Sequence, residues 1–211
     1  MCRLLYIRSN TAFDTSNHLK IFAQICKNSR EYQGHGWGCA YIKNQNWIRY
    51  KNIKPIWEDN LNQFKSTRTL IAHARSAFRD QDIGLENNMP FYKGELAFIF
   101  NGELHGVRIK EEGRIGAEKI FNLLTRFHDG DILKALHKGV KILESRTRYI
   151  KAMNIIISDK DRAFIISKFN EDPEYFTIYY KETDQERIIC SEPYPGESNW
   201  QKLKNGTIGV F

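Results

Sequence analysis

Cys2 is the residue of this sequence with the clearest capacity for chemistry, because removal of Met1 would make it the N-terminal residue. It would then carry both a thiol and a free α-amine. A thiol attacks as its thiolate, and an α-amine with a pKa of about 7.7 to 8.0 is a competent base near neutral pH. One residue can therefore act as nucleophile and general base. The alternative is that Cys2 is a small core residue at the start of an apolar strand.

Asn101 and Gly102 follow an apolar run and offer the donors that such a nucleophile needs. Attack of a thiolate on an amide carbon creates a tetrahedral oxyanion, which preorganised N–H groups stabilise. An asparagine side chain provides an NH2 group, and a glycine lets a backbone N–H approach a ligand closely. In isolation the same dipeptide is also typical of a plain turn at a strand end.

Arg75 ends another apolar run, from which its guanidinium can reach into a cleft. A guanidinium binds a carboxylate through two parallel hydrogen bonds. The competing interpretation is an exposed arginine at a strand end. We interpret His73, just before it, as a structural histidine, since the α-amine of Cys2 already fills the role of base.

Together with Cys2, five short segments resemble the class II glutamine amidotransferases, whose glutaminase domain is an N-terminal nucleophile (Ntn) hydrolase. The resemblance extends over nearly the whole chain and is strongest to the stand-alone branch that includes γ-glutamyl amide hydrolases. It implies that Cys2 is the nucleophile, that Asn101 and Gly102 form the oxyanion hole, and that Arg75 binds the substrate α-carboxylate. The segments are residues 34–38, 72–75, 85–91, 100–104 and 190–193.

The resemblance also implies positions beside the substrate for Trp37, Gly38 and Ser191. Residues 36–38 are similar to a backbone segment that passes close to the nucleophile, where glycines permit the approach. An aromatic that fills a tight turn is the alternative for Trp37. Ser191 is expected in the wall of the pocket.

Gly116 stands where many members of the family carry an aspartate that pairs with the substrate α-ammonium. We therefore expect weak binding of free glutamine, unless another acid such as Glu112 or Glu118 substitutes. Weak binding of free glutamine is compatible with a separate ammonia-using synthetase subunit that completes the pocket, or with a γ-glutamyl amide as the substrate. Two alternatives to a glutaminase stay open: a non-catalytic binding or regulatory subunit with the same fold, and an Ntn amidase for a different amide. The implied chemistry needs no cofactor and no metal.

The 211 residues are expected to form one domain over residues 1–211, because no linker or repeat interrupts the chain. The four cysteines lack metal-site spacing, and there is neither a secretory leader nor an apolar stretch long enough to span a bilayer, so a cytoplasmic protein without a membrane partner is expected. The net charge is +7, but the basic residues are interleaved with acidic ones and form no cluster, so we expect no nucleic-acid partner.

Periodicity predicts strands alternating with clustered helices. This order favours two stacked sheets covered by helices, and the resemblance implies the α+β four-layer αββα sandwich. We predict helices at residues 14–27, 57–64, 115–127 and 131–144, and strands at residues 2–8, 38–43, 46–51, 69–73, 96–100, 152–158, 163–168, 176–180, 187–190 and 207–211.

Overall fold

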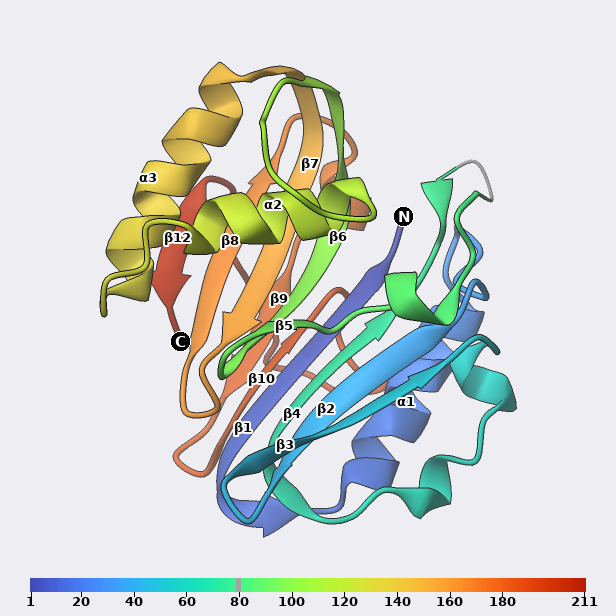
Figure 1. Cartoon of the computed structure of the whole chain (residues 1–211). Helices are drawn as coiled ribbons and strands as arrows, with labels where there is room; N and C mark the ends of the chain where they lie inside the picture. The colour runs from blue at the N-terminus through green and yellow to red at the C-terminus, as the bar shows by residue number, and fades with distance from the viewer. Residues whose placement is uncertain (79–80) are drawn as a thin grey trace.

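The computed structural model describes residues 1–78 and 81–211. Within these residues the chain forms two antiparallel sheets, one of seven strands and one of five. Figure 1 shows the sheets stacked face to face, with one helix against the outer side of the larger sheet and two helices against the outer side of the smaller one. The predicted α+β fold with four αββα layers is confirmed.

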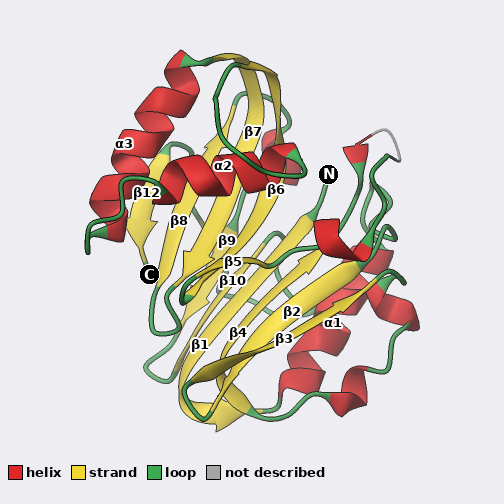
Figure 2. Cartoon of the chain, in the orientation of Figure 1, coloured by secondary structure: helices red, strands yellow, loops and turns green. Residues whose placement is uncertain are grey.

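The larger sheet consists of β1 (Arg3–Phe13), β2 (Trp37–Lys43), β3 (Asn46–Asn52), β4 (Thr67–Ala74), β9 (Tyr179–Glu182), β10 (Glu186–Cys190) and β11 (Gln201–Lys202), in the order β11-β9-β10-β1-β4-β2-β3. The smaller sheet consists of β5 (Phe91–Lys93), β6 (Leu96–Val107), β7 (Thr147–Ser158), β8 (Ala163–Phe169) and β12 (Thr207–Val210), in the order β12-β8-β7-β6-β5. The helices, red in Figure 2, include α1 (Thr15–Lys27), α2 (Gly116–Thr125), α3 (Ile132–Ser145) and the short α4 (Pro173–Phe176).

Two hydrophobic cores lie on opposite sides of the larger sheet. Successive side chains of a strand point to opposite faces. Leu4 of β1 and Ile71 of β4 accordingly belong to the core that also contains the smaller sheet, whereas Leu5 and Leu70 pack in the core with α1. The face of β1 and β4 that looks toward the smaller sheet is called the inner face below.

The helices predicted at residues 14–27, 115–127 and 131–144 are confirmed as α1, α2 and α3, with small shifts at their ends. Asp14 caps α1 by accepting from the Ser16 N–H (2.9 Å), and Asp131 caps α3 by accepting from the Lys134 N–H (3.0 Å). Each cap satisfies a backbone donor that has no partner inside its helix. The apolar stripes of α2 and α3 pack on the smaller sheet, as their periodicity predicted.

Three predictions about elements are wrong. The helix expected at residues 57–64 is instead two short 3-10 turns, η1 (Ile56–Glu58) and η2 (Leu61–Gln63). The strand expected from Phe176 is preceded by α4, which ends there, because Asp172 caps a helical turn that begins at Pro173. The strand expected at residues 96–100 does not end there, because β6 continues through Asn101 and Gly102, which pair with Asn154 and Met153 of β7.

Candidate active site

The Cys2 thiol lies at the start of β1, half-buried against the segment that follows β4. Its Sγ atom is 3.4 Å from the Ser76 N–H, which donates to it, and 3.6 Å from the Ser76 carbonyl oxygen. Burial raises the pKa of the thiol, while the N-terminal ammonium, the Ser76 N–H and Arg75 act in the opposite direction. Since burial dominates, the thiol is protonated at neutral pH and needs a base before it can attack.

Met1 makes polar contacts with three residues. Its ammonium pairs with the Glu31 carboxylate. Its carbonyl oxygen accepts from the Gln33 side-chain NH2 group (2.6 Å) and from the Tyr175 hydroxyl. Both Gln33 and Tyr175 are buried. Two buried donors therefore lie at the peptide bond that joins Met1 to Cys2.

Arg3 anchors the strand that carries Cys2. Its buried guanidinium stacks 3.9 Å from the centre of the Tyr175 ring, donates to the Ser29 hydroxyl (3.2 Å) and the Tyr175 carbonyl (3.3 Å), and pairs with Glu192. A guanidinium paired and bonded in this way avoids the cost of burying an isolated charge. The network fixes the position of the residue next to Cys2.

His73 connects the larger sheet to the strand that carries Asn101. Its Nε2 atom is 3.1 Å from the Phe100 carbonyl oxygen, so it donates to β6 immediately before Asn101. Leu4 pairs with His73 in the larger sheet, which places this contact beside the start of β1. Burial lowers the pKa of His73 to about 3, so the ring is neutral near pH 7. This geometry favours the structural interpretation of His73 over a role as base.

The neutral state of His73 predicts a pH dependence of stability. Unfolded His73 has a pKa near 6.5, so between pH 6.5 and 3 the unfolded state binds a proton that the folded state does not. Stability is therefore lost as the pH falls through this range. We expect the difference in unfolding free energy between the unaltered chain and His73→Gln to shrink by up to about 1.4 kcal/mol per pH unit below pH 6. Urea unfolding of both proteins at pH 7, 6 and 5 measures it, and parallel pH curves would contradict the assignment.

Asn101 faces the larger sheet. On β6, the ring centre of Phe98 lies 4.6 Å from that of Phe121 in α2, so Phe98 faces the helices. Asn101 is three positions further along the strand and therefore points to the opposite face. Asn101 is buried, and among the described residues its side-chain oxygen has no partner. Asn154, its neighbour across the ladder, donates to the Phe176 carbonyl at 2.6 Å.

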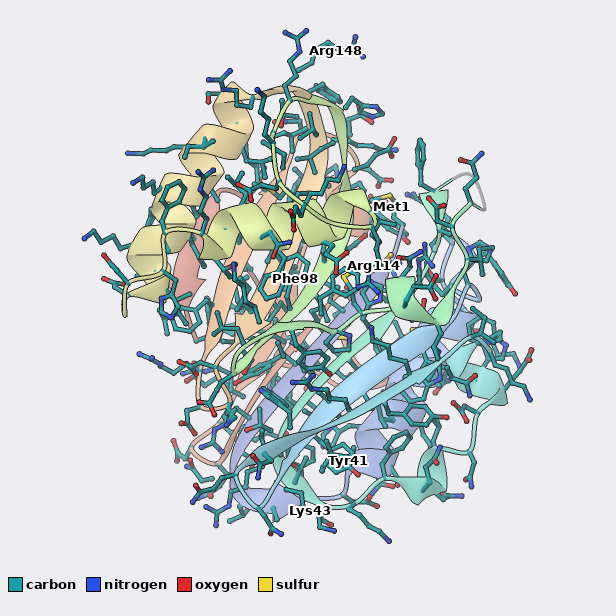
Figure 3. The ribbon with its side chains drawn as sticks, viewed as in Figure 1. Met1, Tyr41, Lys43, Phe98, Arg114 and Arg148 are labelled. Atoms are coloured by element: carbon teal, nitrogen blue, oxygen red, sulfur yellow. The ribbon has the colours of Figure 1, made fainter. Side chains whose placement is uncertain are left out.

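Gly102 has no room for a side chain. A Cβ atom built there would lie 2.2 Å from the Ala152 carbonyl oxygen and 2.8 Å from Cε2 of Phe100. Ala152 belongs to the small cluster against which Met1 packs. The Asn101–Gly102 pair and the N-terminus of β1 therefore approach the same part of β7 from two sides. Figure 3 labels Met1 at this end of the sheets, and Tyr41 and Lys43 at the opposite end of β2.

Arg75 is buried directly after β4, two positions beyond His73 and therefore on the inner face. Its backbone bonds to residues 35 and 36, while its Nη1 atom is buried with no partner among residues 1–78 and 81–211. Burial lowers the pKa of Arg75, and Cys2, Asp82 and Glu86 offset part of that effect. A buried guanidinium with unused donors suits a carboxylate ligand.

Trp37, Gly38 and Ser191 are placed differently from the catalytic candidates. The Trp37 side chain lies in the core with α1 and donates to Asp59 at 2.9 Å, so a substrate contact by this side chain is excluded. Gly38 pairs with His73 on the inner face and makes room for the Met89 carbonyl, which would be 2.5 Å from a Cβ atom. The Ser191 hydroxyl accepts from the Leu4 N–H at 2.8 Å. This bond ties Ser191 to β1.

The position of Gly116 is open, and a Cβ atom there would meet nothing within 4 Å. Glu118, suggested from the sequence as a substitute acid, is occupied by Arg114, which donates from Nε (2.9 Å) and Nη2 (2.6 Å). Arg114 also holds the pKa of Glu118 below its usual range. Glu118 is therefore not a free partner for an ammonium group.

Gln33, Tyr175 and Ser76 were missed by the sequence reasoning. Gln33 stands one position before the glycine-rich segment at residues 34–38. Neither Gln33 nor Glu31, two positions earlier, belongs to a motif that indicates a site. Tyr175 lies in α4, directly before the strand that was expected from residue 176. Because α4 was not predicted, neither was the contact between Tyr175 and Met1. Within the described part of the chain, no group of three or more His, Cys, Asp or Glu residues could hold a metal ion, and no helix is long and apolar enough to cross a membrane.

The sequence matches no protein-family model, and no curated protein matches it significantly. Solved structures share its fold. A glutamine aminotransferase class-II domain protein from Silicibacter pomeroyi superimposes with a TM-score of 0.69 at 16% identity, over 99% of this chain and 94% of that one. A predicted glutamine amidotransferase from Pseudomonas aeruginosa gives 0.65 at 16% identity, over 100% and 97%.

Glutamine phosphoribosylpyrophosphate amidotransferase from B. subtilis, solved with ADP and GMP, gives a TM-score of 0.63 at 15% identity. The match covers 90% of this chain but 42% of that protein. At these identities the likeness establishes the fold alone. The fold is that of the class II glutamine amidotransferase domain.

Proposed function

We propose that this chain is an amidohydrolase with an N-terminal cysteine nucleophile, acting on the side-chain amide of glutamine or of a γ-glutamyl amide. The observation that carries the proposal is the arrangement of three groups around the inner face. Cys2 precedes Leu4 of the inner face by two positions, so its side chain is expected on that face. Asn101 points toward the larger sheet and directly follows the Phe100 carbonyl that His73 contacts. Arg75 is buried, and its Nη1 atom has no partner among residues 1–78 and 81–211. The likeness in fold to glutamine amidotransferases supports the proposal.

In the proposed mechanism, the α-amine of mature Cys2 accepts the thiol proton, and the thiolate attacks the amide carbon. The Asn101 NH2 group and the Gly102 N–H stabilise the oxyanion, while Arg75 holds the α-carboxylate. The amine then passes its proton to the leaving nitrogen, and the C–N bond breaks. Water hydrolyses the thioester to a carboxylic acid and regenerates the thiol.

The base of this mechanism does not exist while Met1 is attached, because a peptide nitrogen has no basic lone pair. We therefore propose that the mature protein begins at Cys2. The test is the intact mass of protein purified from cells, followed by reaction with a diazoketone analogue of glutamine. We expect loss of Met1 and one covalent adduct on Cys2. A mature chain that neither forms the adduct nor hydrolyses any γ-glutamyl amide would contradict the proposal.

The role of Arg75 predicts an effect on binding. Arg75→Lys keeps the charge but loses the planar pair of donors, so we expect KM to rise by about tenfold or more with a smaller change in kcat. Arg162→Lys is a matched control, since Arg162 makes a surface pair with Asp159. Steady-state kinetics separate the two parameters. A fall confined to kcat in Arg75→Lys would show that this residue does not bind the ground state.

Ammonia released by such an enzyme needs an acceptor. A separate ammonia-using synthetase subunit would provide one. Alternatively, the substrate is a γ-glutamyl amide whose amine is itself the product.

A further inference from the structure

We propose that the space occupied by Met1 in the unprocessed chain becomes the subsite for the leaving amine of a γ-glutamyl amide, and that this amine carries a short apolar chain with a cationic group. The proposal rests on the amidohydrolase function above and names its substrate class. It follows from what holds Met1 in place, because Met1 is itself an acyl group bonded to the nitrogen that serves as base.

The position of the leaving group follows from the proton transfer. The α-amine must donate to the leaving nitrogen, so the two nitrogens come within hydrogen-bond reach, about 2.7 to 3.2 Å. The carbonyl carbon of Met1 is bonded directly to that α-amine. Any substituent on the leaving nitrogen therefore begins within a few ångströms of the space that Met1 vacates. Free glutamine, whose leaving group is ammonia, would leave this space unused.

The walls of the space are apolar. Met1 packs against a buried cluster of Ala152, Tyr175 and Phe176, which Phe169 also contacts. The Met1 side chain is only 12% exposed, although it is the first residue of the chain. Through the Ala152 carbonyl beside Gly102, and through the Asn154 contact with Phe176, this cluster adjoins the proposed oxyanion hole. Removal of Met1 would uncover apolar surface next to the reacting atoms.

The charge at the edge of the space is negative. The Glu31 carboxylate, whose side chain is 39% exposed, pairs with the Met1 ammonium and loses that partner when Met1 is removed. Two cations near Glu31 have acids of their own, since Arg3 pairs with Glu192 and Arg30 with Asp172. A cationic group on the leaving amine would take the place of the Met1 ammonium.

The remaining polar groups serve the base. Gln33 and the Tyr175 hydroxyl donate to the Met1 carbonyl, and after its removal they face the new α-amine. Donors directed at the lone pair of an amine favour its neutral form, which is the form that accepts the thiol proton. In the reaction the amide C–N bond breaks as the C–S bond forms, and the thiol proton reaches the leaving nitrogen through this amine. Water then yields the γ-carboxylate, so the products are glutamate and the free amine.

The test compares four substrates with mature protein: glutamine and the γ-glutamyl amides of butylamine, 1,4-diaminobutane and 4-aminobutyrate. The last three have chains of similar length that differ in end charge. Burying each methylene is worth roughly a threefold to fourfold gain. We expect kcat/KM for the butyl amide to exceed that for glutamine by at least about tenfold, with the aminobutyl amide highest and the carboxylate lowest of the three. Glutamine equal to or above the butyl amide would overturn the subsite.

Glu31→Gln tests the charge. We expect the preference for the aminobutyl over the butyl amide to fall by about threefold, because the ion pair is partly exposed. Glu58→Gln, an exposed acid on η1, is the control and should keep the preference. An unchanged preference in Glu31→Gln would overturn the assignment of Glu31.

The proposed amine subsite and the proposed amidohydrolase activity can each be wrong while the other is right. Titration of mature Cys2→Ala protein with butylamine and 1,4-diaminobutane measures the subsite without turnover. Turnover of glutamine with no amine binding and no preference among the amides would leave the amidohydrolase standing and overturn the subsite. Absence of all turnover and of the diazoketone adduct, with saturable amine binding that Glu31→Gln weakens, would overturn the amidohydrolase and retain a cationic amine site.

Discussion

Mature Cys2→Ala protein is expected to fold like the unaltered chain and to lose amide hydrolysis by on the order of 10⁴-fold or more. The loss is large because, in the proposed mechanism, the thiol forms the covalent intermediate, and no other described thiol is placed to replace it. Cys26, Cys39 and Cys190 are all buried. Cys2 itself is only half-buried, so we expect its replacement to change the free energy of unfolding by less than about 1 kcal/mol.

Cys39→Ala is the matched control for this result. Cys39 lies in the core between the larger sheet and α1, on the face of β2 that points away from the site. Its truncation should cost about 1 kcal/mol of stability and leave hydrolysis in place. Initial rates and urea unfolding are measured on both variants. If Cys2 is the nucleophile, Cys2→Ala loses activity and keeps its stability, whereas Cys39→Ala loses some stability and keeps its activity. Equal loss of activity in the two variants would instead indicate damage to the fold.

The layered fold was predictable because its signals are local. The stripe in α1 and the cap at Asp14 specify that helix without reference to the rest of the chain. The short β5 and β11 were not predicted, since three and two residues carry too little alternation to be recognised. The pair at residues 101 and 102 was open to interpretation as a turn because the dipeptide alone favours one. Pairing with β7 over the whole of β6 overrides that preference.

The candidate site was predictable only where its residues match a motif. Trp37 illustrates what a motif leaves open, because the motif does not say which face of the sheet its side chain occupies. Successive side chains of a strand alternate between faces, so Trp37 points toward α1 while Gly38 lies on the inner face. Gln33 and Tyr175 lie 142 positions apart and meet at the Met1 carbonyl. No spacing in the sequence can indicate such a contact, which arises when α4 packs beside the start of β1. The contacts of Met1 therefore had to come from the structure.

Asn101→Ala is expected to reduce kcat by about a hundredfold to a thousandfold, with little change in KM. Removal of one oxyanion donor typically costs about 3 to 4 kcal/mol in the transition state, and the substrate amide bears no such charge before attack. Asn101→Asp should lose at least as much, although it preserves the shape, because a carboxylate repels the developing negative charge. This order of the two variants distinguishes electrostatic stabilisation from packing.

Asn154→Ala provides the comparison, because Asn154 lies directly opposite Asn101 in the ladder and is equally buried. Its side chain donates to the Phe176 carbonyl, so truncation leaves a buried acceptor without its donor and should cost about 1 to 3 kcal/mol of stability. Because that bond exists before the substrate binds, the variant should lose less than about tenfold in kcat at a temperature where it is folded. Steady-state kinetics with parallel unfolding curves measure both residues. If Asn154→Ala lowered kcat as much as Asn101→Ala, the oxyanion hole could not be assigned to Asn101, and the reaction would depend on the polar ladder as a whole.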